Sequence, residues 1–98
     1  MPLETTRWDV ADHLDSDEAV AAYLEAAFAE ADPSLIAAAL GDVARARGMT
    51  SVAREAGLSR ESLYKALSPE GNPELATVLR VLRALGVRLS VQSVEQAA

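Results

Sequence analysis

The sequence contains no cysteine, a single histidine and only four aromatic residues among 98. Without cysteine, the chain can form no disulfide, hold no metal through a thiolate and use no thiol nucleophile. His13 has no second histidine with which to share a metal, and no Gly-rich phosphate loop is present. Asp9, Asp12 and Asp15 lack the alternating oxygen ligands and closing Glu of a calcium loop, which favours a solvated acidic face. We therefore predict a protein that is not an enzyme and holds no metal or cofactor.

Long apolar runs are also missing from the sequence. No stretch approaches the ~20 residues that span a membrane, and the N-terminus lacks a basic region followed by an apolar core. We therefore expect a cytoplasmic protein. Half of the residues are nevertheless hydrophobic. A chain of this length forms one domain, and its scarcity of aromatic residues favours a core of closely packed helices with small side chains.

The net charge of −6 is distributed unevenly along the chain. Residues 1–32 contain nine acidic side chains and one basic side chain, which gives a net charge of −8. Residues 33–98 contain eight basic and six acidic side chains, which gives a net charge of +2. The second part can therefore lie along phosphates, whereas the first part is repelled by them and suits a basic protein partner.

The stretch from Met49 to Leu67 has the spacing of two short helices that cross closely. Ala53 is small enough for a second helix to pass above it, and Gly57 can take the positive φ that turns the chain. Ser59 can cap a second helix that runs from about Arg60 to Leu67. Together these positions predict a helix-turn-helix motif.

The exposed face of this motif is the predicted DNA-binding surface. An Arg near the start of the second helix can pair with guanine, and the first helix can offer its N-terminus to a phosphate. We predict DNA contacts by Thr50, Ser51, Ser59, Arg60, Glu61, Tyr64 and Lys65. The alternative interpretation is a small helical hairpin whose polar face is merely solvated.

Three further helices are predicted around the motif. Ser16 can cap a helix, and the apolar spacing after it predicts that this helix runs through about Ala31. Its apolar stripe packs on this chain, on a partner or on both, and consists of Val20, Tyr23, Leu24, Ala27 and Phe28. Asp32 and Pro33 open a second helix that runs to about Arg47. Asn72 and Pro73 open a third, which Gly86 ends.

After Gly86 the pattern changes from helical spacing to alternation. Val87, Leu89 and Val91 fall on one face and polar residues on the other, which predicts a β-strand. A lone strand seeks a partner, so we predict that it pairs with the same strand of a second copy, the alternative being a frayed tail. The whole pattern predicts an all-α fold, a lambda-repressor-like helix-turn-helix bundle of about five helices with a short C-terminal β-strand.

Much of the chain resembles the antitoxins of HigA-like addiction modules. The resemblance is carried by residues 33–50 and by Ala-Gly-Leu-Ser-Arg-Glu-Ser-Leu-Tyr-Lys-Ala-Leu-Ser at residues 56–68. It extends back to residues 22–27 and forward through Gly-Asn-Pro at residues 71–73 to Leu85 and Gly86. The resemblance implies a helix-turn-helix antitoxin of a type II toxin–antitoxin module, which represses its own operon and neutralises a small RelE/ParE-like toxin.

Charge and resemblance together predict two functional parts. Residues 1–31 form an acidic helical extension that binds the toxin, and residues 32–98 form the DNA-binding domain with its C-terminal strand. The predicted partners are operator DNA, the toxin and a second copy of the chain. The predicted toxin contacts are Trp8, Asp9, Asp12, Tyr23, Leu24 and Phe28. Two alternatives stay open: a phage-type repressor without a toxin partner, and a helical protein-interaction module.

Overall fold

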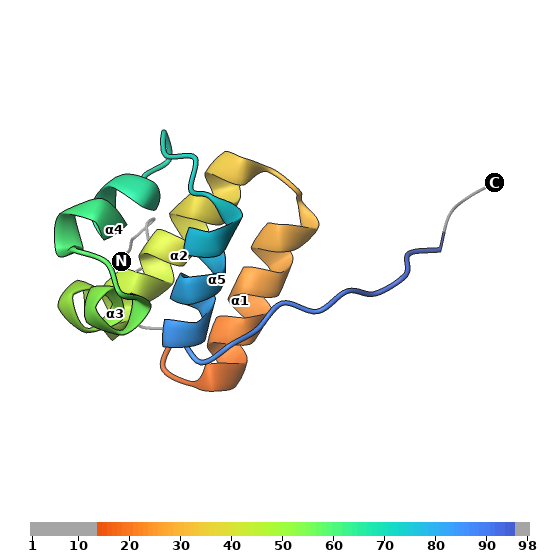
Figure 1. Ribbon diagram of the computed structural model, residues 1–98. Helices are drawn as coiled ribbons and strands as arrows, with labels where there is room; N and C mark the ends of the chain where they lie inside the picture. Colours follow the sequence, from red (N-terminus) through yellow and green to blue (C-terminus); the bar gives the residue numbers. More distant parts are fainter. Residues whose placement is uncertain (1–13, 96–98) are drawn as a thin grey trace, which may run out of the picture.

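A computed structural model describes residues 14–95, which form five helices (Figure 1). The helices are α1 (Asp17–Ala29), α2 (Pro33–Arg47), α3 (Met49–Ala56), α4 (Arg60–Ala66) and α5 (Leu75–Ala84). The prediction of an all-α chain with about five helices is therefore confirmed. No helix within residues 14–95 is both long enough and apolar enough to cross a membrane.

The first two helices begin where the capping residues predict. The Ser16 hydroxyl accepts a hydrogen bond from the amide of Ala19 at 3.0 Å, and the Asp32 carboxylate accepts one from the amide of Ser34 at 3.0 Å. Each cap satisfies an amide that has no partner inside its helix. Pro33 occupies the first position of α2, where a missing N–H costs nothing.

The start of α5 differs from the prediction by two residues. Asn72 and Pro73 lie in the connection before the helix, which begins at Leu75 with Glu74 as its N-cap. The backbone of Glu74 is extended, while its carbonyl accepts the first helical bond from the amide of Val78 at 3.0 Å. Pro73 therefore precedes the helix instead of opening it.

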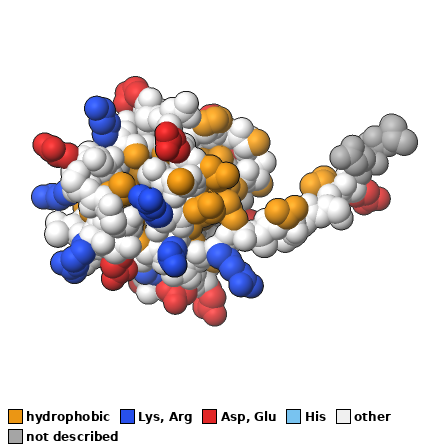
Figure 2. All heavy atoms as spheres, viewed as in Figure 1, with side chains coloured by type: hydrophobic (Ala, Val, Ile, Leu, Met, Phe, Trp, Pro, Cys, Tyr) orange, Lys and Arg blue, Asp and Glu red, His pale blue; other side chains and the backbone are white. Residues whose placement is uncertain are grey.

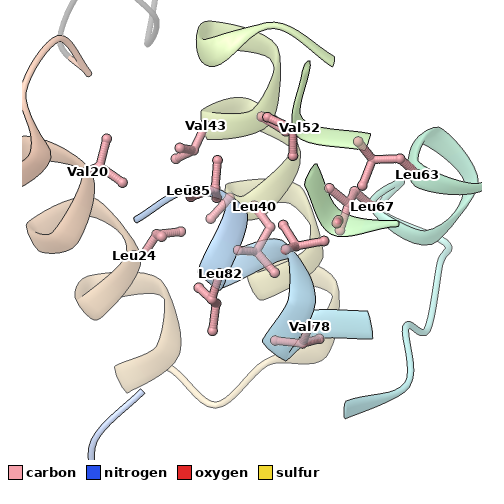
Figure 3. Packing of buried hydrophobic residues seen from close by; sticks show 14 of the residues in the cluster. Val20, Leu24, Leu40, Val43, Val52, Leu63, Leu67, Val78, Leu82 and Leu85 are labelled. Atoms are coloured by element: carbon pink, nitrogen blue, oxygen red, sulfur yellow. The ribbon is translucent and has the colours of Figure 1, made fainter. Parts of the chain in front are cut away.

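One hydrophobic core joins all five helices. Its largest fully buried side chains are Leu40, Leu63, Leu85, Val20, Val43 and Val81. Figure 3 shows Val20 and Leu24 of α1 pointing toward the same interior as Leu40 and Val43 of α2. The apolar stripe of α1 therefore packs on this chain's own bundle, while contact of the same helix with a partner stays a prediction.

Two polar contacts also hold α1 against α2. The hydroxyl of Tyr23 donates to the carboxylate of Asp42 at 2.6 Å, and Arg47 forms an ion pair with Asp17 at 2.9 Å. Burial, the hydrogen bond to Asp42 and the charge of that carboxylate raise the pKa of Tyr23 to about 12. The ion pair is largely exposed and contributes ~1 kcal/mol at most.

The predicted C-terminal β-strand does not form in the single chain. The amide of Val87 donates to the carbonyl of Leu82 at 3.0 Å, after which the segment 87–95 runs away from the helices (Figure 1). No strand is present in the part of the chain that the structure describes. The physical reason is the absence of another extended segment there with which the backbone could form a ladder.

Candidate nucleic-acid interface

The candidate interface begins at the turn between α3 and α4. Gly57 adopts a left-handed conformation with φ of 74°, which a residue with a Cβ adopts only with strain. The amide of Leu58 donates to the carbonyl of Ala53 at 2.8 Å, and the amide of Gly57 donates to the carbonyl of Arg54 at 3.2 Å. These bonds close the end of α3 and aim the chain into α4.

The second helix of the pair is held by its cap and by its buried side. The Ser59 hydroxyl accepts a hydrogen bond from the amide of Ser62 at 3.0 Å, as the sequence predicts. Leu63 is fully buried, and Leu67 lies in the same core just after the helix ends. Since these two side chains point inward, the opposite side of α4 faces solvent.

That outer side of α4 carries a group of polar side chains. Arg60, Glu61, Tyr64 and Lys65 are exposed and border a shallow hollow of about 490 Å³. The guanidinium carbon of Arg60 lies 5.4 Å from the centre of the Tyr64 ring, and an Arg60 nitrogen donates to the Tyr64 hydroxyl at 3.4 Å. This cation–π contact orients the guanidinium before any ligand arrives. The i,i+4 spacing of Arg60 and Tyr64 on a helix is the sequence signal that indicates this contact.

The first helix presents its own exposed polar end. Thr50 and Ser51 lie exposed in the first turn of α3. The N-cap of this helix is Gly48, so no side chain caps its first amides. Free amides and the helix dipole at such an end favour an anion. Thr50 and Ser51 thus lie exposed at a helix end whose electrostatics favour a phosphate.

A second group of basic residues, which the sequence pattern does not bring together, lies between α3 and α5. Arg54 and Glu55 of α3 border a hollow of about 350 Å³ together with Arg80 and Arg83 of α5. Within residues 14–95 none of these three arginines forms an ion pair. The packing of α5 on α3 brings them together, and only the excess of basic residues after position 32 hinted at them.

On the surface of the five helices, charged side chains and exposed hydrophobic side chains gather in different regions. Figure 2 shows Lys and Arg side chains, with Asp and Glu side chains among them, over the part formed by α3, α4 and α5, and hydrophobic atoms gathered where the C-terminal segment leaves the helices. Across residues 49–67, Arg54, Arg60 and Lys65 outnumber Glu55 and Glu61, which gives a net charge of +1. The region around the α3–α4 pair is therefore compatible with a polyanion.

The other predicted site residues are divided between core and surface. Trp8, Asp9 and Asp12 lie outside the described residues. Leu24 belongs to the core at 4% exposure. The remaining members are half-buried or exposed, and they are Tyr23, Phe28, Val87, Leu89 and Val91.

Comparison with known proteins gives one family and one relative. A family model described as "Probable addiction module antidote protein" matches residues 4–93. A protein of Haemophilus influenzae described as uncharacterized is 53% identical over 85 residues, which cover 87% of this chain and 88% of that protein. No solved structure matches the chain.

Proposed function

The chain belongs to the family of probable addiction module antidote proteins, and from this membership we propose that it is the antitoxin of a type II toxin–antitoxin module. An antidote implies a toxin as its partner. In this proposal the toxin is RelE/ParE-like, in keeping with the resemblance to HigA-like antitoxins. The same chain represses its own operon through a lambda-repressor-like helix-turn-helix formed by α3 and α4.

One observation carries the DNA-binding part of the proposal. The outer face of α4 is exposed along its length, while the left-handed turn at Gly57 and the buried Leu63 hold its other face on the core. Such a helix can enter the major groove without unfolding anything. Arg60 reads a guanine in this proposal, with Ser59, Glu61 and Tyr64 beside it.

Phosphate contacts supply the remaining affinity. Thr50 and Ser51 contact one phosphate through the start of α3, and Lys65 contacts another from α4. Arg54, Arg80 and Arg83 extend this basic surface, and their side chains have no ion-pair partner among residues 14–95. Phosphate contacts fix the position on the duplex, while Arg60 supplies the sequence preference.

A shift assay on the DNA upstream of the gene tests this part. We expect Arg60→Ala to lose preference for the operator and to keep a salt-sensitive background binding. Arg45→Ala is the matched control, because Arg45 is an exposed arginine on α2 that is paired with Asp42. If the wild-type chain retards operator DNA and unrelated DNA equally weakly, it is a protein-interaction module and not a sequence-specific DNA-binding protein.

The toxin contact is assigned to the acidic N-terminal part. Residues 1–32 carry a net charge of −8, which costs DNA affinity and suits a basic partner. In α1, the exposed Glu25 borders the same groove as the half-buried Phe28, so an apolar centre with an acidic rim is available there. The predicted contacts at Trp8, Asp9, Asp12, Tyr23 and Leu24 stay part of the proposal.

Co-expression with the product of the neighbouring gene tests the toxin contact. We expect the two proteins to copurify when only one of them carries a tag. A phage-type repressor without a toxin predicts no copurification and no protection of cells. The neighbouring reading frame should be short and basic if the proposal holds.

The third part of the proposal is a homodimer. Repressor motifs of this kind bind half-sites one helical turn of DNA apart, which a two-fold pair of chains provides. Val87, Leu89 and Val91 are proposed to pair as a β-strand with the same residues of a second copy. The uncovered apolar side chains of this segment support the assignment.

A further inference from the structure

Three arginines on two packed helices border one hollow at the surface. Arg54 of α3 and Arg80 and Arg83 of α5 are exposed, and we call them the arginine cluster. Among the residues that line this hollow of about 350 Å³, Glu55 is the only acidic one. Three positive charges and one negative charge give the hollow a net charge of +2, on a chain whose net charge is −6. Like charges held close together repel each other, so an anionic occupant is favoured.

The start of α1 lies close to the end of α5 that carries this cluster. Arg47 of α2 pairs with Asp17 of α1 at 2.9 Å and donates to the carbonyl of Leu85 at 3.5 Å. Arg83 stands two residues before Leu85, in the last turn of α5. Figure 1 accordingly shows the start of α1 beside the end of α5. A single arginine side chain therefore spans the distance between the two helix ends.

The stretch of chain that leads into α1 is acidic. Residues 8–15 contain no Lys or Arg, and their acidic members are Asp9, Asp12 and Asp15. Leu14 is 5% exposed and anchors the end of this stretch in the core. An extended chain advances ~3.3 Å per residue, so Asp12 can lie up to ~16 Å and Asp9 up to ~26 Å from Asp17. The end of α5 is therefore within reach of these carboxylates.

We propose that residues 8–15 dock on the arginine cluster of the same chain when no other partner holds them. Their carboxylates pair with the guanidinium groups of α3 and α5, so the chain covers its own basic hollow. The proposed function assigns these arginines to phosphates, and the docked stretch therefore competes with DNA. This effect on DNA rests on the proposed function, whereas the contact itself does not.

Tethering favours this occupant over a separate anion. A segment joined to its binding site by a short stretch of chain has an effective concentration in the millimolar range. Exposed ion pairs are individually weak and screened by salt, so they hold a tethered segment where they would not hold a free one. Within residues 14–95 the three arginines have no ion-pair partner, and the acidic stretch contains one carboxylate for each of them.

The contact has a regulatory consequence, because the proposed function assigns the same stretch to the toxin. Trp8, Asp9 and Asp12 cannot contact a toxin and the arginine cluster at the same time. A bound toxin therefore frees the cluster for phosphates, and the complex of the two proteins binds operator DNA more tightly than the free antitoxin. The coupling is reciprocal, so operator DNA also favours binding of the toxin.

The absence of cysteine allows the contact to be measured in the full chain and without DNA. Asp12→Cys and Arg83→Cys, introduced together, should form a disulfide within one chain under mild oxidation, because docking brings their Cβ atoms close to the ~4 Å that a disulfide needs. Arg45→Cys replaces Arg83→Cys in the matched control, since Arg45 is an exposed arginine already paired with Asp42. We expect the first pair to react about fivefold faster or more at low salt, and the two rates to converge near ~1 M salt.

DNA binding provides a second measurement. Asp9→Asn/Asp12→Asn should tighten binding to any duplex by about three- to tenfold at low salt, because it releases the arginine cluster. Glu30→Gln/Glu95→Gln is the matched control, since it makes the same change of net charge with exposed residues outside the acidic stretch. The control should change binding by less than about twofold, because distant exposed charges are screened.

A double-mutant cycle separates docking from general repulsion between the acidic stretch and phosphates. If the stretch docks, Asp9→Asn/Asp12→Asn should have little effect in a chain that also carries Arg80→Gln/Arg83→Gln. If the stretch only repels phosphates, its effect is the same with and without the two arginines. Arg80 and Arg83 are exposed and outside the core, so this variant should fold.

The outcomes separate this inference from the proposed function. Faster cross-linking between positions 12 and 83, together with a loss of the Asp9→Asn/Asp12→Asn effect when the arginines are replaced, supports the inference. Equal rates for the two cysteine pairs, or an effect that persists without the arginines, overturns it and leaves operator binding intact. If the wild-type chain ignores operator DNA, the proposed function fails, and the cross-linking rates still decide whether the stretch docks.

Discussion

The pair formed by Arg60 and Tyr64 yields a quantitative prediction about DNA recognition. If Arg60 pairs with a guanine, Arg60→Ala should weaken operator binding by ~1–3 kcal/mol, about 5- to 150-fold. The guanidinium lies 5.4 Å from the ring centre of Tyr64, within the range where an exposed cation–π contact contributes ~0.5–1 kcal/mol. Tyr64→Ala should therefore weaken binding about two- to fivefold. The hydrogen bond between the two residues is long at 3.4 Å, so Tyr64→Phe should stay close to wild type.

A double-mutant cycle measured by fluorescence anisotropy decides how Tyr64 acts. If Tyr64 only orients Arg60, the double variant Arg60→Ala/Tyr64→Ala should bind no more weakly than Arg60→Ala. Binding to unrelated DNA should change little in any of these variants. Thermal melts serve as the folding control, and they should shift little because Tyr64 is 42% exposed.

Two results would refute this reasoning. If Tyr64→Ala weakens binding by the same factor with and without Arg60, the tyrosine contacts DNA on its own account and the stack is incidental. If Arg60→Ala weakens operator and unrelated DNA equally, Arg60 contacts a phosphate and the reader of the base lies elsewhere on α4.

Four further predictions concern stability and the N-terminal part. Gly57→Ala should destabilise the fold by ~1–2 kcal/mol in urea melts, through backbone strain alone, because no atom lies within 4 Å of the added Cβ. Leu40→Ala should cost ~2–5 kcal/mol, since Leu40 is fully buried, whereas a loss under 1 kcal/mol would contradict its central position. Folding raises the pKa of Tyr23 from 10.0 to about 12, so the contribution of the neutral hydroxyl to stability is complete below pH 10. This contribution is lost as the pH rises toward 12, and Tyr23→Phe should therefore show a smaller decrease of the unfolding free energy over this pH range in urea melts. A chain lacking residues 1–12 keeps every residue that the structure describes, so it should fold and bind operator DNA. It should protect cells poorly from the toxin, and full protection would instead place the toxin contact on the helices.

The truncation point follows from the packing of α1. A cut at residue 31 matches the functional division that the charge pattern predicts. It would also remove Val20, Leu24 and Ala27 from the core. Loss of protection by such a protein could then come from unfolding alone. The shorter deletion avoids this ambiguity.

The local elements of this protein were determined by short stretches of sequence. Ser16, Asp32 and Ser59 cap the helices that follow them, and Gly57 takes the positive φ between α3 and α4, all as predicted. Each of these features depends on hydrogen bonds or backbone freedom within four residues. The start of α5 shows the limit of such reasoning, because Pro73 can open a helix or precede one and its local preference is the same in both cases.

Tertiary structure decided which surfaces remain free. The stripe of α1 satisfies the same periodicity whether it packs on α2 or on a partner, and only the shared core shows that it packs on α2. The cluster of Arg54, Arg80 and Arg83 joins residues far apart in the chain through the contact between α3 and α5. The C-terminal strand is the opposite case: alternation of side chains specifies a face, but a ladder needs a second backbone, which residues 14–95 of one chain do not provide. Periodicity in a sequence therefore determines which face of an element is apolar, and only packing in three dimensions determines what covers that face.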